Sequence, residues 1–366
     1  MPLTPSRQYC RNVRHRIRPK LLPAFPTPPA QSPQNPLHSG RKHEQRLTGS
    51  HHNLSHWTYP VVTGARSKGA HPSRRYRLTL NATERRTAVR ERYARAAVTG
   101  DTCCEPANDD PGTDGSAATA SGAKTTADEI SCAVGYGQDE LNRVPEGANL
   151  GLGCGNPVAL ASLAPGETVL DLGSGAGFDC FLAAERVGPE GRVIGVDMTS
   201  EMVERARANA LKGGFANVEF RLGEIEALPV PDGVADIIIS NCVLNLSANR
   251  PRVLAEAMRA LRPGGRVMIS DLVSDHPMPD FIAHSKASLV GCLPVQVAEY
   301  EADLAAAGFT DINVEKRQRY PSEHILADPQ VQAVIRRQPA REAEVHAFLE
   351  SIHGGTICAT KPEAAE

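Results

Sequence analysis

Three cysteines are the residues of this chain whose type and setting best suit chemistry. Cys154, Cys242 and Cys292 each stand beside a glycine or an asparagine, in stretches that read as loops or strand ends. A cysteine that only fills a core behaves as a small hydrophobe among apolar neighbours. The chain has no Cys-x2-Cys pair, so a local zinc ribbon is not expected. Thiols from distant parts of the chain can still converge in space on one soft metal or metalloid.

The other cysteines carry weaker signals. Of the nine in the chain, Cys180 fits a structural role, because it begins an apolar helical run. Cys10 and Cys358 are expected to lie in tails, without a task. A Cys103-Cys104 pair opens a Gly- and Asp-rich stretch that predicts a loop.

A glycine-rich turn is the second feature with chemical meaning. Residues 168–172 are a short apolar run with one acid, Asp171, and predict a buried strand. Three glycines follow at alternate positions, Gly173, Gly175 and Gly177, before a helix expected from about residue 181. The turn lacks the last glycine of a dinucleotide site and the Lys-Ser/Thr of a phosphate loop. It therefore predicts a ligand without a pyrophosphate, with a plain strand-to-helix turn as the alternative.

An acid follows at the end of the next expected strand. Residues 192–197 end in Asp197, about 25 residues past the turn, near the spacing at which an acid binds ribose hydroxyls in this topology. The alternative role for Asp197 is to cap a helix expected at 199–209, and the two roles are compatible.

Strands and helices alternate from residue 168 onward. Further strands are expected at 218–222, 236–240 and 266–269, and helices at 252–261 and 297–307. This alternation predicts a mainly parallel sheet with helices on both faces and ligands beyond the carboxyl ends of the strands. Gly173, Asp197, Glu224 and Cys242 all fall at such ends.

Outside this core the pattern is weaker. Helices are expected at 83–98, 139–143, 158–163 and 281–290, a loop at 99–129 and a strand at 309–315. Residues 317–366 contain no motif that predicts a structure or a role.

Residues 1–83 differ in composition from the rest. They hold fourteen Lys and Arg, one acid and eleven of the 28 prolines, while the remainder carries 26 basic and 41 acidic residues. This basic, aperiodic stretch is expected to be disordered. It could bind nucleic acid or an anionic surface, act as a targeting peptide or be a solvated tail; we favour a start site assigned too far upstream. No run reaches the ~18 apolar residues of a membrane helix, so a cytoplasmic protein with reduced thiols and no membrane partner is expected.

Seven segments together carry a resemblance to a known family. They are Gly-Leu-Gly-Cys154-Gly-Asn-Pro, Asp-Leu-Gly-Ser-Gly-Ala-Gly-Phe-Asp-Cys180, Gly-Val-Asp197-Met-Thr, Gly-Glu224-Ile-Glu-Ala-Leu-Pro, Ile-Ile-Ser-Asn-Cys242-Val-Leu-Asn-Leu, Leu-Arg-Pro-Gly-Gly-Arg266 and Val-Gly-Cys292-Leu. The order resembles that of bacterial arsenite methyltransferases, over about residues 84–320. The Asn-Cys242 segment is the most discriminating, because most small-molecule methyltransferases have no cysteine there.

The resemblance implies an S-adenosylmethionine-dependent enzyme with the α/β fold of class I methyltransferases, a doubly wound and mainly parallel sheet. It also implies a division of the chain. Residues 1–83 are a disordered extension, 84–275 the cofactor-binding domain with an N-terminal thiol loop, and 276–366 a smaller metalloid-binding region.

The resemblance also implies roles for single residues. Cys154, Cys242 and Cys292 match the thiols that bind trivalent arsenic, and Cys104, or its neighbour Cys103, matches a fourth that acts with Cys154 in redox turnover. The positions implied in cofactor binding are Asp171, Gly173, Ser174, Gly175, Asp197, Met198, Glu224, Ile225 and Asn241.

The implied partners are small molecules. Arsenite and methylated trivalent arsenicals would be the substrates, and thioredoxin or glutathione the reductant. The lone pair of arsenic is the nucleophile, so no general base is required. A nucleic-acid substrate is not expected, because the body of the chain is acidic.

Two features depart from the family pattern, and two other functions stay open. Leu-Pro294-Val follows Cys292 where the family usually has small residues, and Cys132 could replace the Cys103-Cys104 pair. One alternative is a methyltransferase of a small organic molecule such as a quinone precursor, which leaves the loop cysteines without a task. The other is a non-catalytic protein that binds soft metals, which needs no cofactor turn.

Overall fold

One sheet organises the described part of the chain, which comprises residues 81–100, 126–279, 293–319, 335–336 and 339–364 of a computed structural model. Within these residues eight strands form the order β3-β2-β1-β4-β5-β8-β7, with β6 paired to β5. The strands are β1 (Thr168–Leu172), β2 (Arg192–Asp197), β3 (Val218–Leu222), β4 (Ala235–Asn241), β5 (Leu261–Ser274), β6 (Val295–Gln296), β7 (Thr310–Arg319) and β8 (Ile352–Thr360). Strands β1 to β5 pair in parallel, whereas β8 runs antiparallel to β5 and β7.

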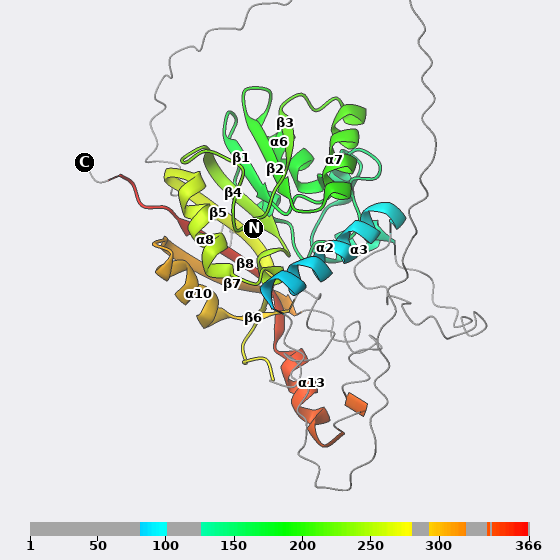
Figure 1. Ribbon diagram of the computed structural model, residues 1–366, viewed down its shortest axis with the longest axis vertical. Helices are drawn as coiled ribbons and strands as arrows, with labels where there is room; N and C mark the ends of the chain where they lie inside the picture. The colour runs from blue at the N-terminus through cyan, green and yellow to red at the C-terminus, as the bar shows by residue number, and fades with distance from the viewer. Residues whose placement is uncertain (1–80, 101–125, 280–292, 320–334, 337–338, 365–366) are drawn as a thin grey trace, which may run out of the picture. The chain divides into compact units, whose positions relative to one another are not determined.

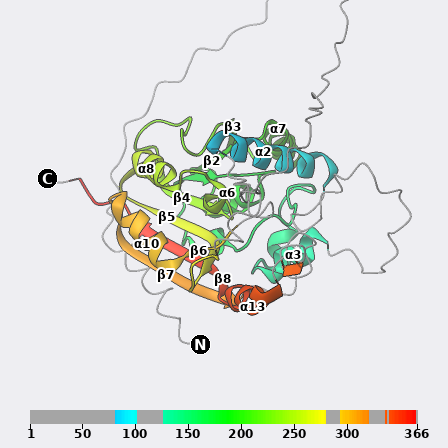
Figure 2. The same cartoon turned by 60° about the horizontal axis from the view of Figure 1, so that its bottom comes forward.

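Side chains of each central strand alternate between two cores on opposite faces of the sheet. In β4, Ile238 packs in one core, and Ile237 and Ile239 pack in the other. Helices α6 (Phe178–Val187) and α7 (Ser200–Gly213) contribute to the core of Ile237. Helices α8 (Arg250–Ala260) and α10 (Val297–Ala306) contribute to the core of Ile238 (Figures 1 and 2). The predicted doubly wound, mainly parallel α/β fold is therefore confirmed.

Helix α2 (Ala82–Thr99) lies ahead of the sheet in the chain and beside α7 in space (Figure 2). The Asn81 side chain accepts a hydrogen bond from Glu84 N at 2.9 Å, and the Glu84 carboxylate accepts one from Asn81 N at 2.8 Å. This reciprocal pair is a capping box, which satisfies two backbone donors at the helix start. Asn81 is therefore the N-cap, and the helix begins one residue before the predicted residue 83.

Several predicted boundaries shift. Helix α3 (Ala127–Ala133) begins inside the predicted loop 99–129, because Thr126 and Glu129 form a second capping box there. Strand β5 is longer than the predicted 266–269 at both ends. The remaining helices are α4 (Gln138–Leu141), α5 (Pro157–Leu160), η2 (Leu244–Leu246), η4 (Pro339–Arg341) and α13 (Glu342–Glu350). The predicted helix 281–290 lies outside the described residues.

Strand β8 was not predicted, and the expectation that Cys358 lies in a tail was wrong. Cys358 is opposite Met268 of β5 in the interior of the sheet, with its S–H directed at Met268 Sδ, 3.5 Å away. The two glycines of β8 interrupt the alternation of apolar and polar residues by which a strand is recognised in a sequence. A Cβ on Gly355 would lie 2.8 Å from Val273 Cγ1, so the close approach of β5 excludes a side chain there. Residues beyond 276 thus extend the main sheet, and the division after residue 275 stays a prediction.

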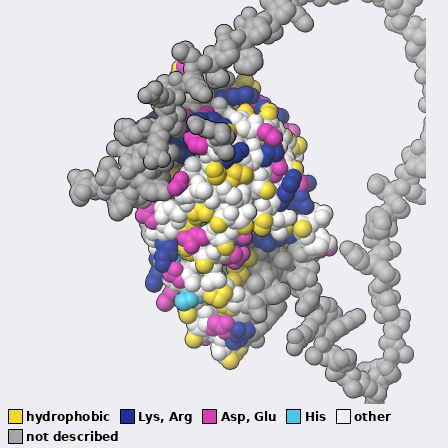
Figure 3. Space-filling view, turned by 90° about the vertical axis from the view of Figure 1, so that its left-hand side faces the viewer, with side chains coloured by type: hydrophobic (Ala, Val, Ile, Leu, Met, Phe, Trp, Pro, Cys, Tyr) yellow, Lys and Arg dark blue, Asp and Glu magenta, His cyan; other side chains and the backbone are white. Residues whose placement is uncertain are grey.

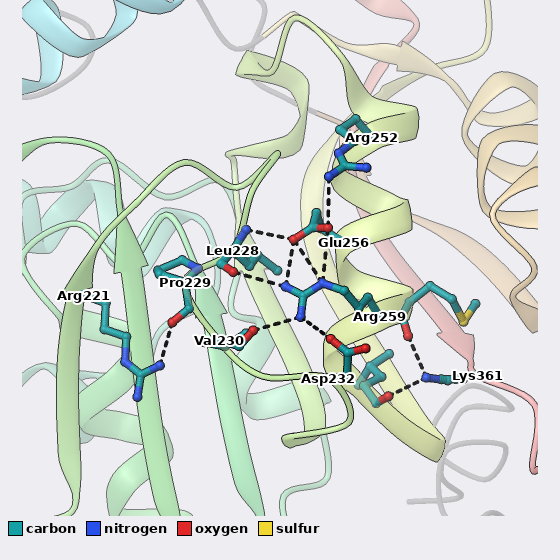
Figure 4. Close-up of polar contacts among 11 residues, drawn as sticks. Arg221, Leu228, Pro229, Val230, Asp232, Arg252, Glu256, Arg259 and Lys361 are labelled. Carbon is teal, nitrogen blue, oxygen red and sulfur yellow. Dashed lines mark hydrogen bonds and ion pairs between the residues drawn. The ribbon is translucent and has the colours of Figure 1, made fainter.

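An arginine of α8 fixes the segment between β3 and β4 (Figure 4). Arg259 donates to the carbonyl oxygens of Leu228 and Val230, and to the carboxylates of Asp232 and Glu256. Glu256 in turn accepts from Leu228 N at 2.9 Å. These carboxylates raise the pKa of Arg259 and hold it charged. The loop that follows β3 is therefore held against α8.

The described residues on the face in Figure 3 carry mixed charge. Basic and acidic side chains are interspersed there with apolar ones, without a field of one sign. None of the described helices combines the length and apolar character that spanning a membrane requires.

Candidate functional site

The glycine turn after β1 has the conformation that its sequence predicts. Gly173, Gly175 and Gly177 have φ of +72°, +51° and +96°, values that side chains rarely tolerate. A Cβ on Gly173 would lie 2.4 Å from Val243 Cγ2, so the backbone passes directly under the segment after β4. Asp197 at the end of β2 stabilises the turn, since its carboxylate accepts from Gly175 N at 3.0 Å and Thr199 N at 2.8 Å.

A cavity lies over this turn, at the carboxyl ends of β1, β2 and β4. Eight of the nine residues expected to bind the cofactor line it: Asp171, Gly173, Ser174, Gly175, Asp197, Met198, Ile225 and Asn241. Glu224 is placed differently, because its carboxylate pairs with Arg86 and Arg90 of α2. The neighbouring Glu226 lines the cavity instead.

The cavity has the electrostatics of a site for a cation. Burial raises the pKa of Asp171 well above its usual range, and the Asp179 carboxylate raises it further. Burial raises the pKa of Asp179 to about 6, although hydrogen bonds from Tyr136 and Asn241 act in the opposite direction. Burial also raises the pKa of Asp197, although backbone hydrogen bonds from Thr199 and Gly175, among others, act in the opposite direction. A positive ligand among three carboxylates lowers the free energy of their charged forms.

The residues present fit S-adenosylmethionine, which carries a sulfonium and an ammonium group. The Ser174 hydroxyl is buried at the cavity and has no hydrogen-bond partner among the described residues, so a polar ligand group can complete it. A Cβ on Gly175 would meet nothing within 4 Å, so a ligand in the cavity can approach this part of the backbone closely. Side chains from α2 and from the segment before α5, including Val89, Tyr93 and Leu150, also line the cavity.

Two of the predicted thiols meet beside this cavity. Cys242 lines it directly, and Cys154 follows Gly153, another lining residue. The carbonyl oxygen of Ser270 on β5 connects them, since it accepts from Cys242 N at 2.8 Å and from Cys154 Sγ at 3.7 Å. Cys242 has φ of +60°, a strained conformation of the kind that concentrates at functional sites.

Asn241 joins the thiols to the cofactor cavity. Its Oδ1 accepts from Cys154 N at 2.9 Å, and its Nδ2 donates to Gly155 O at 2.8 Å and to Asp179 Oδ2 at 3.0 Å. Tyr136 completes the network, because its hydroxyl donates to Asp179 Oδ1 at 2.6 Å. Asp179 and Tyr136 were not predicted as site residues. The sequence indicated them only as an acid just after the glycine turn and an aromatic residue between two glycines.

Asp271 is a further residue that the sequence did not single out. One of its carboxylate oxygens and the sulfurs of Cys154 and Cys242 all lie within 4.8 Å of one another. The Asp271 side chain is fully buried on β5. An acid next to an apolar run was the feature of the sequence that could have indicated a role for it.

The remaining cysteines have different settings. Cys292, Cys103 and Cys104 lie outside the described residues. Cys132 is exposed on α3. Cys180 is fully buried in α6, and its S–H donates to Asp171 Oδ2 at 3.2 Å. Burial and the Asp171 carboxylate both raise the pKa of this thiol, so the protonated form that makes the hydrogen bond is favoured.

The sheet order, the glycine turn and the acid after β2 define a class I, S-adenosylmethionine-dependent methyltransferase. In agreement, residues 163–320 match the family described as a methyltransferase domain. The chain is 46% identical over 269 residues to an arsenite methyltransferase of Halobacterium salinarum, covering 71% of this chain and 68% of that protein. The chain therefore belongs to the arsenite methyltransferase family.

Two other relatives cover less of their own length or are more distant. An arsenite methyltransferase of Aquipseudomonas alcaligenes is 42% identical over 168 residues, which are 43% of this chain and 48% of that protein. The crystal structure of an arsenic (III) S-adenosylmethionine methyltransferase from Chlamydomonas reinhardtii aligns with 30% identity and a TM-score of 0.45, over 66% of this chain and 75% of that one.

Proposed function

We propose that this protein transfers the methyl group of S-adenosylmethionine to trivalent arsenic held by Cys154, Cys242 and Cys292. The observation that carries the proposal is the position of Cys242, which lines the cofactor cavity while its sulfur lies within 4.8 Å of the sulfur of Cys154. A metalloid held by these thiols would be next to the methyl donor. Membership of the arsenite methyltransferase family supports the same substrate.

Binding of arsenite releases water. Each thiol replaces one hydroxyl of arsenite, so that an As–S bond forms, an As–OH bond breaks and the thiol proton leaves in the water. The thiolate is the ligand form, so binding is coupled to this proton release. The buried carbonyl of Ser270 and the amide oxygen of Asn241 hold the two described thiol segments in place beforehand.

S-adenosylmethionine, when bound, supplies an electrophilic methyl group on its sulfonium. The protein contributes alignment, because a fixed near-attack geometry lowers the barrier to displacement. Asp197 and the glycine turn are proposed to hold the nucleoside, and Asp171 and Asp179 to stabilise the positive charge of the cofactor. The arsenic lone pair would attack the methyl carbon as the bond from that carbon to the sulfonium sulfur breaks. S-adenosylhomocysteine would then be the leaving group, and no side chain must remove a proton.

A redox step completes the proposed cycle. Methyl transfer formally oxidises arsenic from the trivalent to the pentavalent state. We propose that Cys104 or Cys103, with Cys154, returns two electrons to arsenic and becomes a disulfide, which thioredoxin or glutathione then reduces. Methylated trivalent arsenicals would re-enter the same site. The cycle needs reduced thiols, and we place the enzyme in the cytoplasm for this reason.

The test is incubation of the purified protein with arsenite, S-adenosylmethionine and a thiol reductant, followed by speciation of the arsenic. Methylated arsenic is expected from the parent chain and from Cys358→Ser, whose thiol contacts Met268 within the sheet. Cys242→Ser is the matched inactive variant. Absence of methylated arsenic from the parent, with methylation of a quinone precursor under the same conditions, would overturn the proposal in favour of a small-molecule methyltransferase.

A further inference from the structure

The donor set beside the cofactor cavity contains more than thiols. Asp271 directs a carboxylate oxygen to within 4.8 Å of the sulfurs of both Cys154 and Cys242. The Asp271 side chain is fully buried, and the Tyr300 hydroxyl, itself buried, donates to its Oδ2 at 3.3 Å. Two cysteine sulfurs and one buried carboxylate oxygen at this spacing form a donor set that can hold a metal ion.

The three donors suit a zinc-class cation better than they suit arsenic alone. Zinc accepts cysteine sulfur at about 2.3 Å and aspartate oxygen at about 2.1 Å in a tetrahedron, which places the donors about 3.6–3.8 Å apart. The three donor atoms lie within 4.8 Å of one another, so small movements of the side chains can reach this geometry. A carboxylate oxygen is a hard donor, whereas soft centres select thiolates. Three protein ligands leave the fourth zinc position for water.

The backbone around the donors is already fixed. Cys242 N is held by Ser270 O, and Cys154 N by Asn241 Oδ1. Leu272, Phe348 and other apolar residues of β5, β8 and α13 form a cluster that packs against Cys154. Helix α13 directly precedes β8, whose Gly355 lies opposite Asp271 of β5 (Figure 1). Second-sphere hydrogen bonds and an apolar wall are the two features that orient ligands and control water at metal sites.

We propose that Cys154, Cys242 and Asp271 form a site for a zinc-class divalent cation that competes with arsenite for the two thiols. Two S–H bonds break on binding, their protons leave to solvent, and two metal–sulfur bonds and one metal–oxygen bond form without any redox change. The inference uses the thiols of the proposed arsenic site but adds a ligand class that arsenic methylation does not need. A thiophilic divalent cation would thus inhibit arsenite binding, and Asp271 would set the strength of that inhibition.

The experiment uses cobalt(II) as a spectroscopic probe of the full-length protein, reduced with a non-thiol reductant under anaerobic conditions. The parent chain is expected to show thiolate-to-cobalt charge transfer and tetrahedral visible bands, both abolished by one equivalent of zinc. Asp271→Asn is expected to weaken cobalt and zinc binding by at least the tenfold to hundredfold loss typical of supporting residues at metal sites. Arsenite affinity should change far less. It can be measured from the arsenite concentration that protects the thiols from an alkylating reagent.

Asp275→Asn is the matched control. Asp275 directly follows β5, as Asp271 lies within it, but its carboxylate pairs with Lys316 at the surface. This variant should bind cobalt like the parent. Asp271→Cys guards against loss of folding, since a third sulfur at this position should raise the charge-transfer intensity. Absence of charge transfer in the parent, or equal cobalt affinity in Asp271→Asn, would overturn the inference. Arsenite methylation measured without added metal tests the proposed function separately, so the two can fail independently.

Discussion

Asn241 holds Cys154 through the backbone: its Oδ1 accepts the Cys154 N–H at 2.9 Å, while its Nδ2 reaches Asp179 across the wall of the cofactor cavity. One side chain thus spans the thiol loop and the turn that would hold the methyl donor. A displacement on either side of Asn241 changes the distance between the two reactants, and methyl transfer depends strongly on that distance.

Gly153→Ala tests this connection. A Cβ at residue 153 would lie 2.6 Å from Asn241 Nδ2, so the amide must move and its bonds to both sides weaken. We expect kcat for arsenite methylation to fall by about 10²-fold, the loss typical of a misplacement of this size. Gly137→Ala is the control, because its nearest contact would be 3.9 Å away. Unchanged kcat in Gly153→Ala would show that the Asn241 connection does not position the reactants.

The thiols are predicted to differ in function. Cys154→Ser, Cys242→Ser and Cys292→Ser should each abolish arsenite methylation, because a hydroxyl is a poor ligand for a soft centre. Cys180→Ser should keep activity, since a serine hydroxyl can still donate to Asp171 as the thiol does. Arsenic speciation and thermal unfolding of all four variants check this. An active Cys242→Ser would remove that residue from the site, and a folded but inactive Cys180→Ser would make Cys180 functional.

Asp197→Ala is predicted to weaken S-adenosylmethionine binding without changing arsenite affinity. Hydrogen bonds to a charged group contribute about 1.5–3 kcal/mol, which corresponds to a tenfold to hundredfold rise in Kd. The same carboxylate holds Gly175 N and Thr199 N, so the turn should also loosen. Calorimetric titration with the cofactor and with arsenite separates the two affinities. Equal cofactor affinity in variant and parent would place the ribose elsewhere.

Cofactor binding is predicted to depend on pH through Asp179. Its pKa of about 6 lies above its unfolded value, so the folded state holds the proton longer as pH rises. The contribution of Asp179 to the free energy of unfolding is therefore greatest at low pH and declines between about pH 4 and 6. Ionised Asp179 attracts a cationic ligand, so S-adenosylmethionine should bind more tightly as pH rises through 6. Dissociation constants of parent and Asp179→Asn across this range check the prediction; parallel profiles would contradict it.

The Cys103-Cys104 pair is predicted to serve turnover rather than binding. With both changed to serine, methylation of an already methylated trivalent arsenical should persist better than repeated turnover from arsenite, because the three-thiol site remains. A double variant that behaves like the parent would leave Cys132, which is exposed on α3, as the candidate for the redox role. The triple variant with Cys132→Ser then distinguishes redundancy from the absence of any redox role.

Local features of the site could be predicted, because each depends on neighbouring residues. The turn at Gly173 to Gly177 and the acid ending β2 both follow from short patterns, and they lie at the predicted edge of the sheet. Helix α2 begins at Ala82, one residue before the predicted start at residue 83, because Asn81 caps it.

Features that depend on distant residues could not be predicted. The approach of Cys154 to Cys242 requires the pairing of β4 with β5, which no spacing encodes, and only the family resemblance suggested it. Asp271 and Tyr300 meet because α10 packs on β5. Strand β8 was not predicted, because its two glycines interrupt the alternation of apolar and polar residues that identifies a strand.

The antiparallel insertion of β8 between β5 and β7 has a consequence for synthesis on the ribosome. Strands β1 to β5 can pair in the order in which they emerge, but among the described strands β7 pairs with β8 alone. Gly355 must pass the exit tunnel before it can lie opposite Asp271. Until then one edge of β5 is open, and open edges invite pairing between nascent chains. The environment of the buried Asp271 carboxylate is thus completed only after β8 has been translated.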